Sequence, residues 1–328
     1  MREAIQTTAL DSQIKLSVII PARDALGYLP AAIASIEDAA RTDLEIIVVD
    51  DGSRDGSGEW LAQIIATESR LKVLTLDGLG VANARNMGIF AAQGQWIAFL
   101  DADDLWRPGK LSQQLAFHHK NPDVVMSFTD YEHVDPDGKS YGTSFEYWPQ
   151  FRRMMLQTGA TGDFQVLQNA AARVFAENAI GTSTVMVRRD AMIASGGFRR
   201  DLQIAEDFDM WLRLAAMGPV AASPMVGTEY LVRPGSASRN LPMRQACLRD
   251  VFSLHWRRVI QQSPAAVLKS YGRILEGDAG LPHAWGQSMT ALRLAGAAIM
   301  TGDYRPGRAA LGIFQRDVLG FRRSEVVQ

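Results

Sequence analysis

Two clusters of aspartates stand out in this sequence as side chains that could do chemistry. Asp50 and Asp51 lie in the stretch VVDDGSRDGS, and Asp101, Asp103 and Asp104 lie in the stretch FLDADD. Carboxylates that face one crevice repel each other unless a positive group joins them. Hard oxygen ligands at alternate positions suit Mg²⁺ or Mn²⁺, which keep bound waters and complete their coordination with substrate phosphates. The clusters therefore predict a site for a divalent cation and a phosphorylated substrate.

The apolar runs around these clusters predict the fold that positions them. Runs of strand length cover 15–20, 44–50, 71–76 and 96–101, and segments with helical spacing cover 28–40, 57–69 and 80–93. Strands that alternate with helices in this way form a mostly parallel sheet with helices on both faces. Both clusters then lie at the carboxyl edge of the sheet, where ligands bind in such folds. We expect the first strand to end at Pro21, because proline cannot continue the ladder.

A structural explanation competes with the functional one at some of these acidic residues. Asp and Ser side chains satisfy free amide groups at helix starts, and Asp51 and Asp55 precede a predicted helix. We interpret Asp55 and Ser57 as capping residues. Asp101 and Asp103 are interpreted as functional.

The second half of the chain is less regular. We expect a strand over 124–129, a loop over 135–162, a strand over 182–188, and helices over 190–195 and 208–216. From residue 244 onward the pattern is almost wholly helical.

Composition and charge exclude several classes of protein. Of the 328 residues, 47% are hydrophobic and 21% charged, and the formal net charge is −2, so we expect a globular protein with no nucleic-acid partner. The one cysteine, Cys247, cannot form an intramolecular disulfide, which favours the cytoplasm. We find no signal peptide and no apolar stretch long enough to span a membrane. The terminal helices are amphipathic, so a peripheral contact with the inner membrane face is an alternative that the sequence allows.

One dinucleotide-binding fingerprint fails on its spacing. Gly78 and Gly80 begin a G-x-G-x-x-G pattern, but Asn83 takes the place of the third glycine, which argues against a nicotinamide enzyme.

His118 and His119 are adjacent, so on a helix they point about 100° apart and cannot hold one metal ion together. We interpret both histidines as surface residues.

Six sequence blocks together resemble a family 2 glycosyltransferase with the GT-A fold. They follow the family's order over about residues 15–240, and they are SVIIPARD (17–24), VVDDGSRDGS (48–57), GVANARNMG (80–88), WIAFLDADD (96–104), GTSTVMVRRDAMIASGGF (181–198) and AEDFDMWLRLA (205–215). The resemblance implies a Rossmann-like nucleotide-binding sheet with helices on both faces, followed by a helical C-terminal region. It divides the chain into a tail (1–14), a GT-A domain (15–240) with a nucleotide-sugar half (15–130) and an acceptor half (131–240), and a helical region (241–328).

The resemblance also implies roles for the residues that match the nucleotide-binding motifs. Pro21, Ala22, Asp24 and Asp51 belong to strand-end segments that hold the base and ribose of the nucleotide. Arg85, in the GVANARN block, helps to fix the base or the phosphates.

The acidic motifs of the family correspond to the chemistry of transfer. Asp101, Ala102 and Asp103 form the D-x-D motif and are expected to meet the ribose and diphosphate. Asp103 and Asp104 are the expected ligands of a Mn²⁺ or Mg²⁺ ion that bridges the diphosphate. Asp207, in the E-D pair, is the expected catalytic base, because an acceptor hydroxyl needs a carboxylate within about 3 Å to take its proton. Acidic residues also favour helix N-termini, which is the competing explanation.

The sequence departs from the family pattern at Arg233. Members commonly carry Y-R-x-H-x-x-S-x-S, with the histidine near the metal and diphosphate, whereas this chain has YLVRPGSAS over 230–238. Arginine stays protonated and cannot ligate a cation, but its planar fork suits phosphate. We hypothesise that Arg233 contacts the leaving diphosphate and that the metal has fewer protein ligands.

The resemblance implies an inverting, metal-dependent glycosyltransferase of the hexosyltransferase type. It would move a sugar from a nucleotide-diphosphate sugar, with a UDP-sugar as the expected donor, to a hydroxyl of a glycan or glycolipid. Family association places such a reaction in cell-surface polysaccharide or glycolipid assembly. The alternative is a non-catalytic protein of the same fold that binds sugar nucleotides or acts as a scaffold.

Overall fold

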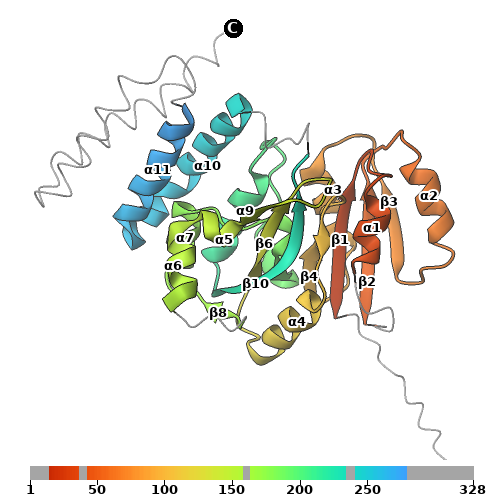
Figure 1. The fold of residues 1–328 in the computed structure, drawn as a ribbon, viewed down its shortest axis with the longest axis horizontal. Helices are drawn as coiled ribbons and strands as arrows, with labels where there is room; N and C mark the ends of the chain where they lie inside the picture. The colour runs from red at the N-terminus through yellow and green to blue at the C-terminus, as the bar shows by residue number, and fades with distance from the viewer. Residues whose placement is uncertain (1–14, 37–42, 158–162, 234–240, 279–328) are drawn as a thin grey trace, which may run out of the picture.

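The computed structural model describes residues 15–36, 43–157, 163–233 and 241–278, and it consists of a large sheet with helices on its faces (Figure 1). The first half of the chain forms β1 (Leu16–Ala22), α1 (Leu29–Ala34), β2 (Leu44–Asp50), α2 (Ser57–Ile64), β3 (Leu71–Thr75), α3 (Val81–Ala91), β4 (Trp96–Phe99), β5 (Leu105–Trp106) and α4 (Lys110–Lys120). The second half forms β6 (Met126–Val134), β7 (Ser140–Thr143), α5 (Ser144–Tyr147), α6 (Pro149–Gln157), β8 (Gln165–Val166), α7 (Ala170–Ala176), the 3-10 turn η1 (Thr182–Thr184), β9 (Met186–Arg188), α8 (Arg189–Ala194), α9 (Glu206–Ala215) and β10 (Val220–Leu231). Two further helices, α10 (Leu241–Gln262) and α11 (Pro264–Asp278), follow.

The sheet has the strand order β3-β2-β1-β4-β9-β6-β10-β5. Strands β3, β2, β1 and β4 are parallel to one another, β6 is parallel to β10, and β9 and β5 are antiparallel to their neighbours. The predicted mostly parallel sheet is therefore confirmed. The predicted end of β1 is wrong, because the strand continues through Pro21 to Ala22. Its register with β4 stops at Ile19, so on that side Pro21 lies at an open edge, where proline is tolerated.

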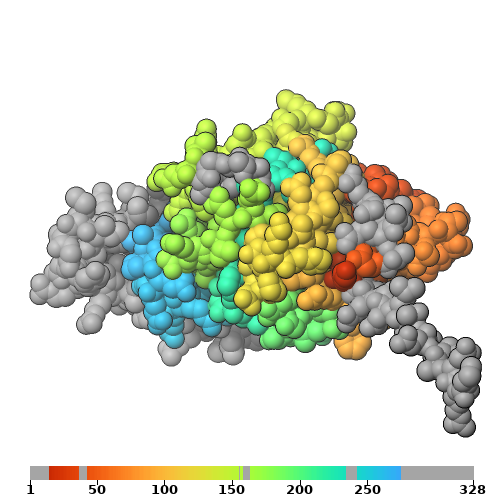
Figure 2. All heavy atoms as spheres, turned by 90° about the horizontal axis from the view of Figure 1, so that it is seen from below, coloured from red at the N-terminus to blue at the C-terminus, as the bar shows by residue number. Residues whose placement is uncertain are grey.

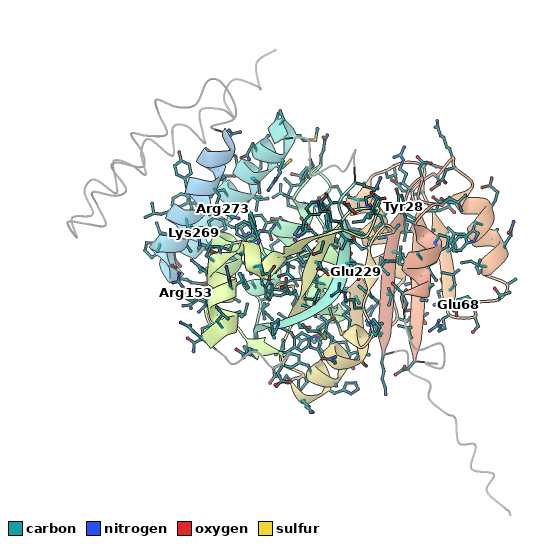
Figure 3. The ribbon with its side chains drawn as sticks, viewed as in Figure 1. Tyr28, Glu68, Arg153, Glu229, Lys269 and Arg273 are labelled. Carbon is teal, nitrogen blue, oxygen red and sulfur yellow. The ribbon has the colours of Figure 1, made fainter. Side chains whose placement is uncertain are left out.

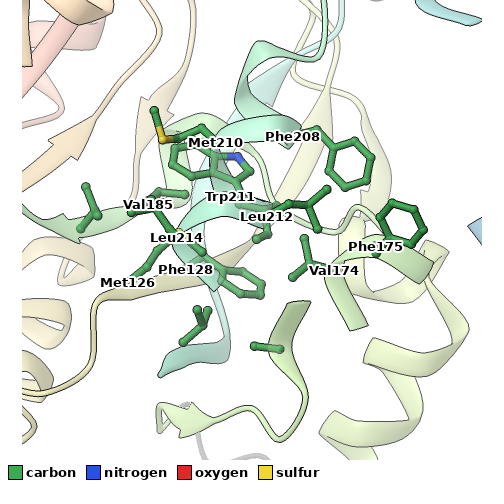
Figure 4. Close-up of a cluster of buried hydrophobic side chains, with 14 of the residues drawn as sticks. Met126, Phe128, Val174, Phe175, Val185, Phe208, Met210, Trp211, Leu212 and Leu214 are labelled. Carbon is green, nitrogen blue, oxygen red and sulfur yellow. The ribbon is translucent and has the colours of Figure 1, made fainter. Parts of the chain in front are cut away.

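Side chains that alternate along the parallel strands fill two hydrophobic cores, one on each face of the sheet. Val18 and Ile20 belong to one core, and Ile19 belongs to the other. The core that contains Ile19 continues beneath α9, where the fully buried Trp211 packs near Phe128 and other apolar side chains (Figure 4). Helix α3 approaches β1 closely in the same core. At Gly88 of α3, a Cβ atom would lie only 2.4 Å from Ile19 Cγ2.

The predicted loop over 135–162 is wrong where the structure describes it, because β7, α5 and α6 occupy most of it. Helix α5 begins with a capping box, in which the Thr143 hydroxyl accepts the amide of Glu146 and the Glu146 carboxylate accepts the amide of Thr143. Helix α6 is anchored by Glu177, whose carboxylate accepts the backbone amides of Gln150 and Phe151. The predicted strand over 182–188 begins instead with η1, and the strand itself covers only 186–188.

His118 is buried, so the prediction that it is a surface residue is wrong. Its ring stacks on Trp96 with centroids 3.9 Å apart, and its Nε2 atom lies 2.8 Å from the Ser127 hydroxyl. Burial lowers the pKa of His118 to about 3, so the ring is neutral at physiological pH. His119 is exposed, as predicted.

Helices α10 and α11 pack against α7 and α9 rather than standing apart (Figure 1), and the space-filling view shows their blue surface next to the green surface of the preceding helices (Figure 2). Phe252 of α10 packs on Phe175 of α7, with ring centroids 5.1 Å apart. His255 of α10 lies 2.8 Å from the buried Asp209 carboxylate of α9. In the part of the chain described here, no helix combines the length and apolar character needed to cross a membrane. The tail over 1–14 and the end of the helical region, 279–328, lie outside the described residues.

Candidate active site

A cavity of about 330 Å³ opens at the carboxyl edge of the sheet. It lies between the ends of β1, β4 and β10 and the start of α9, near the labelled Tyr28 in Figure 3. Its lining comprises Pro21, Arg23, Ala25, Val81, Arg85, Asp101, Ala102, Asp103, Gln203, Ile204, Ala205, Glu206, Asp207, Tyr230 and Arg233. The edge predicted from the aspartate clusters is therefore the place where a cavity forms.

Arg85 is the buried centre of this cavity. It projects from α3, and its guanidinium donates to Glu206 Oε1 at 2.6 Å and to Asp101 Oδ1 at 2.7 Å. The guanidinium also lies 5.4 Å from the centroid of the Phe198 ring. Burial by itself lowers the pKa of Arg85, but the charges of Asp101 and Glu206 outweigh burial and raise it. Arg85 is therefore a permanent cation that joins the end of β4 to the start of α9.

The two acidic residues at the start of α9 share a low-dielectric environment. Helix α9 begins directly after Ala205, which has a left-handed backbone with a φ of 65°. Burial and the neighbouring charge of Asp207 raise the pKa of Glu206 to about 7, against the opposing effect of Arg85. Burial also raises the pKa of Asp207, whose Oδ2 atom accepts the Thr182 hydroxyl at 3.1 Å. A carboxylate with a raised pKa in a cavity has the chemistry of a general base.

Asp103 and Arg233 form an ion pair across the mouth of the cavity. The Arg233 Nε atom lies 2.7 Å from Asp103 Oδ2, and the guanidinium lies 5.3 Å from the centroid of the Tyr28 ring. The side chains of Arg233 and Asp103 are 38% and 24% exposed, so incoming solutes reach both.

Asp104 lies outside the cavity, in contrast to its predicted role as a metal ligand. Its Oδ2 atom accepts the Ser183 hydroxyl at 2.5 Å, and its Oδ1 atom accepts the backbone amide of Leu231 at 3.2 Å. Burial, together with the charges of Asp101 and Asp103, raises the pKa of Asp104 well above its usual range. This geometry makes Asp104 a structural link from the D-x-D loop to η1 and β10.

Three other predicted nucleotide-binding residues also lie outside the cavity lining. Asp51 is buried, and its oxygens accept the amides of Leu79 and Gly80 at 2.7 and 2.8 Å, so it fixes the turn into α3. Asp24 accepts the amide of Arg54 at 2.7 Å, and Ala22 is the last residue of β1. These three residues shape the wall that surrounds the cavity.

Asp55 and Ser57 are not the cap predicted for α2, because its N-cap residue is Gly56 and no side chain caps it, but Asp55 does contact the start of the helix. Its Oδ1 atom accepts both the amide and the hydroxyl of Ser57, the first residue of α2.

Several lining residues had no motif that could mark them in the sequence. Gln203 and Ile204, just before the block that begins at Ala205, are such residues. Arg23, Val81 and Tyr230 also line the cavity and lie inside the matched segments 17–24, 80–88 and 230–238, and that position is the signal that could have drawn attention to them.

The donor groups of the cavity fit a cation held partly by a substrate. Among the described residues, no group of three His, Cys, Asp or Glu side chains could hold a metal ion. The lining nevertheless sets four carboxylates against three guanidinium groups, an excess of negative charge that opposes binding of a diphosphate. Mg²⁺ and Mn²⁺ commonly use one or two carboxylates together with substrate phosphates. Asp101 and Asp103 are both accessible, but the buried Arg85 holds Asp101, which leaves Asp103 as the carboxylate for such a site.

Solved structures share this fold. S. aureus TarS 1–349 in complex with UDP-GlcNAc matches with a TM-score of 0.60 and 16% identity, covering 92% of this chain and 92% of that chain. The mannosyltransferase PcManGT from Pyrobaculum calidifontis, in complex with GDP-Man and Mn²⁺, matches with a TM-score of 0.58 and 18% identity, covering 96% of this chain and 88% of that chain. The architecture is a GT-A fold with a helical C-terminal region, as predicted.

The sequence comparisons define the family. A family model described as glycosyl transferase family 2 matches residues 17–181, about half of the chain. The chain belongs to glycosyl transferase family 2. Asp207 and Arg233 lie beyond the segment that this model matches.

Curated relatives match parts of the chain. The putative teichuronic acid biosynthesis glycosyltransferase TuaG of Bacillus subtilis is 38% identical over 124 residues, which are 38% of this chain and 49% of the relative. The chondroitin synthase of Pasteurella multocida is 26% identical over 203 residues, which are 62% of this chain and 19% of the relative. The chain thus spans about half or less of the length of these relatives.

Proposed function

We propose that this protein transfers a sugar from a nucleotide-diphosphate sugar to an acceptor hydroxyl, with inversion at the anomeric carbon and with Asp207 as the catalytic base. The observation that carries the proposal is the convergence of Arg85, Asp103, Asp207 and Arg233 on one cavity. Guanidinium groups together with a carboxylate that can hold a metal ion for the diphosphate, and a second carboxylate with a raised pKa beside them, are the parts that such a transfer requires.

The proposed reaction is a single displacement. Asp207 accepts the proton of the acceptor hydroxyl while the acceptor oxygen bonds to the anomeric carbon, and the bond from that carbon to the diphosphate oxygen breaks on the opposite face. Both oxygens of Asp207 accept a hydrogen bond, Oδ2 from the Thr182 hydroxyl at 3.1 Å and Oδ1 from the amide of Phe208 at 2.6 Å, and these two contacts orient the carboxylate. Raising the pKa of Asp207 by burial strengthens it as a base.

The diphosphate leaves with additional negative charge, which the cavity must stabilise. Arg233 has a planar fork that suits phosphate oxygens and lies at the mouth of the cavity. Asp103 would hold a divalent cation, which when bound supplies electrostatic stabilisation of the diphosphate. Arg85 is already engaged by Asp101 and Glu206, so we assign it the role of holding these carboxylates in place.

A UDP-sugar is the proposed donor, and a glycan or glycolipid is the proposed acceptor. Support for the donor comes from TarS, which has the same fold and has been solved with UDP-GlcNAc and with UDP. Support for an acceptor in cell-surface polysaccharide assembly comes from the names of TuaG and chondroitin synthase. Pro21, at the end of β1 and in the lining, is the residue proposed to flank the nucleotide.

Calorimetry with purified protein tests the donor site. UDP, GDP, dTDP and their sugars are titrated with and without Mn²⁺ into the wild type, into Asp103→Asn, and into Asp201→Asn as a control with the same chemical change on the exposed surface. We expect metal-dependent binding of one nucleotide that only Asp103→Asn weakens. Binding of none of them would refute the transferase proposal.

A turnover assay with the nucleotide that binds then separates an enzyme from a non-catalytic binding protein. Release of nucleoside diphosphate from its sugar, in the presence of candidate acceptors, is expected in the wild type and lost in Asp207→Asn. Tight binding with no release under any condition would favour the binding-protein alternative.

A further inference from the structure

Arg233 is a positive group already bound to the carboxylate that the proposed metal would use. Its Nε atom lies 2.7 Å from Asp103 Oδ2. Both side chains line the cavity and are accessible to solutes. A divalent cation at Asp103 would therefore meet a guanidinium on the same carboxylate, and two cations at one carboxylate repel each other.

We propose that Arg233 is a resident counter-cation of Asp103 that a divalent metal ion displaces, and that the displaced guanidinium moves onto the diphosphate of the donor. This inference rests on the proposed function. It makes Arg233 a positioning residue that sets when Asp103 becomes available to the metal.

The surroundings of Arg233 allow such an exchange. Its side chain is more than one-third exposed, and it extends past the Tyr28 ring, over which the guanidinium can be held without a carboxylate partner. An ion pair with this degree of exposure is weak, because solvent screens it. The diphosphate offers a stronger partner, since guanidinium and phosphate form paired, charge-assisted hydrogen bonds. The ion pair between Arg233 and Asp103 is thus stable enough to form without a ligand and weak enough to open.

The exchange predicts an order in the affinities. Metal alone must break the ion pair between Arg233 and Asp103 with no phosphate to attract the guanidinium, so it binds weakly. A nucleoside diphosphate draws Arg233 away and frees Asp103, so each ligand strengthens the binding of the other by the same factor. Removal of the Arg233 charge should then strengthen metal binding in the absence of any nucleotide, which a role for Arg233 in binding phosphate alone does not predict.

Titration of Mn²⁺ alone, followed by the electron paramagnetic resonance signal of the free ion, tests this directly. The proteins are the wild type, Arg233→Gln and Arg23→Gln. Arg23 is the matched control, because it is an arginine of the same cavity that lies near Asp51, at 3.8 Å, instead of Asp103. We expect Arg233→Gln to bind Mn²⁺ about fivefold more tightly than the wild type, and Arg23→Gln to show a smaller change. Arg233→Lys, which keeps the charge, should stay close to the wild type.

Two results would overturn the proposal. One is an unchanged Mn²⁺ affinity in Arg233→Gln, and the other is an equal gain in both glutamine variants, which would reflect the net charge of the cavity alone. Calorimetry with UDP and GDP on the same proteins separates this failure from failure of the proposed function. If the wild type binds a nucleotide while the Mn²⁺ result is negative, only the exchange is refuted. Thermal unfolding of each variant confirms that it is folded.

Discussion

Replacing Arg85 by glutamine should destabilise the protein by an amount that depends on pH. Arg85 donates to Glu206 at 2.6 Å and to Asp101 at 2.7 Å, and the Glu206 side chain is only 8% exposed. Breaking a buried ion pair leaves an unpaired charge and costs about 3–5 kcal/mol. Glu206 can avoid most of this cost by binding a proton, so the full penalty should appear only where it is ionised.

The sign follows from the pKa of Glu206, which burial and Asp207 raise to about 7. Between pH 4.5 and 7, the unfolded chain has an ionised Glu206 while the folded protein keeps its proton, so stability decreases as pH rises. In the wild type this decrease ends above pH 7. Without Arg85 the pKa rises further, and the decrease continues at up to about 1.4 kcal/mol per pH unit. We expect Arg85→Gln to be about 1–2 kcal/mol less stable than the wild type at pH 6 and about 3–4 kcal/mol less stable at pH 8.5.

Urea unfolding followed by tryptophan fluorescence measures this difference, since Trp211 of α9 is fully buried. The control compares two further proteins, the single variant Glu206→Gln and the double variant that carries both Arg85→Gln and Glu206→Gln. A neutral side chain at 206 removes the group that titrates. The free-energy gap between these two proteins should stay constant from pH 6 to pH 8.5. If the gap between Arg85→Gln and the wild type is also constant over this range, the reasoning about Glu206 is wrong.

Three further predictions concern the base, the close approach of α3 to β1, and the C-terminal helices. Asp207→Asn should lower kcat about 10²–10⁴-fold and leave donor affinity in calorimetry unchanged. The base must be ionised and its pKa is raised, so the kcat/KM of the wild type should decrease as the pH is lowered, with a midpoint above pH 3.8. Gly88→Ala should cost about 1–3 kcal/mol in urea unfolding, because the added Cβ meets Ile19 at 2.4 Å, whereas Gly272→Ala on α11 has open space and should be neutral or stabilising by up to about 1 kcal/mol. His255→Ala should cost about 1–3 kcal/mol, since it removes a hydrogen-bond partner from a buried carboxylate of α9, and equal stability in the thermal unfolding of both proteins would contradict this.

The parallel half of the sheet could be predicted from the sequence because three of its strands, β1, β2 and β4, are buried on both faces. The run 44–50 is apolar apart from Glu45 and the final aspartate, its residues 46–49 are all β-branched, and the structure forms a strand over the same residues. The segment 135–162 lacks such a run, and its helices depend on partners from elsewhere in the chain. Glu177 anchors α6 from 27 residues away. The capping box from Thr143 to Glu146 was the one local signal in this segment.

The candidate site was predictable as a set of motifs but not as a set of side-chain directions. The motif order predicted that Asp103 and Asp207 would reach one edge of the sheet, and both line the cavity. Asp104 follows Asp103 in sequence, yet it turns toward Ser183 and Leu231, which are 79 and 127 residues away. Spacing along a turn cannot show which neighbour will find a buried partner. The same limit applies to His118, whose burial depends on Trp96 in a strand that precedes it.

The contact between the C-terminal helices and α9 affects how chimaeras of this protein could be built. The layer that supports the proposed base is assembled from three separate segments, α7, α9 and the pair α10 and α11, and its apolar side chains form one core. Exchange of residues after 240 for those of another transferase would place foreign side chains against Phe175 and leave Asp209 buried without His255. A chimaera should therefore exchange all of these helices together, because they pack as one layer although they come from separate segments of the sequence.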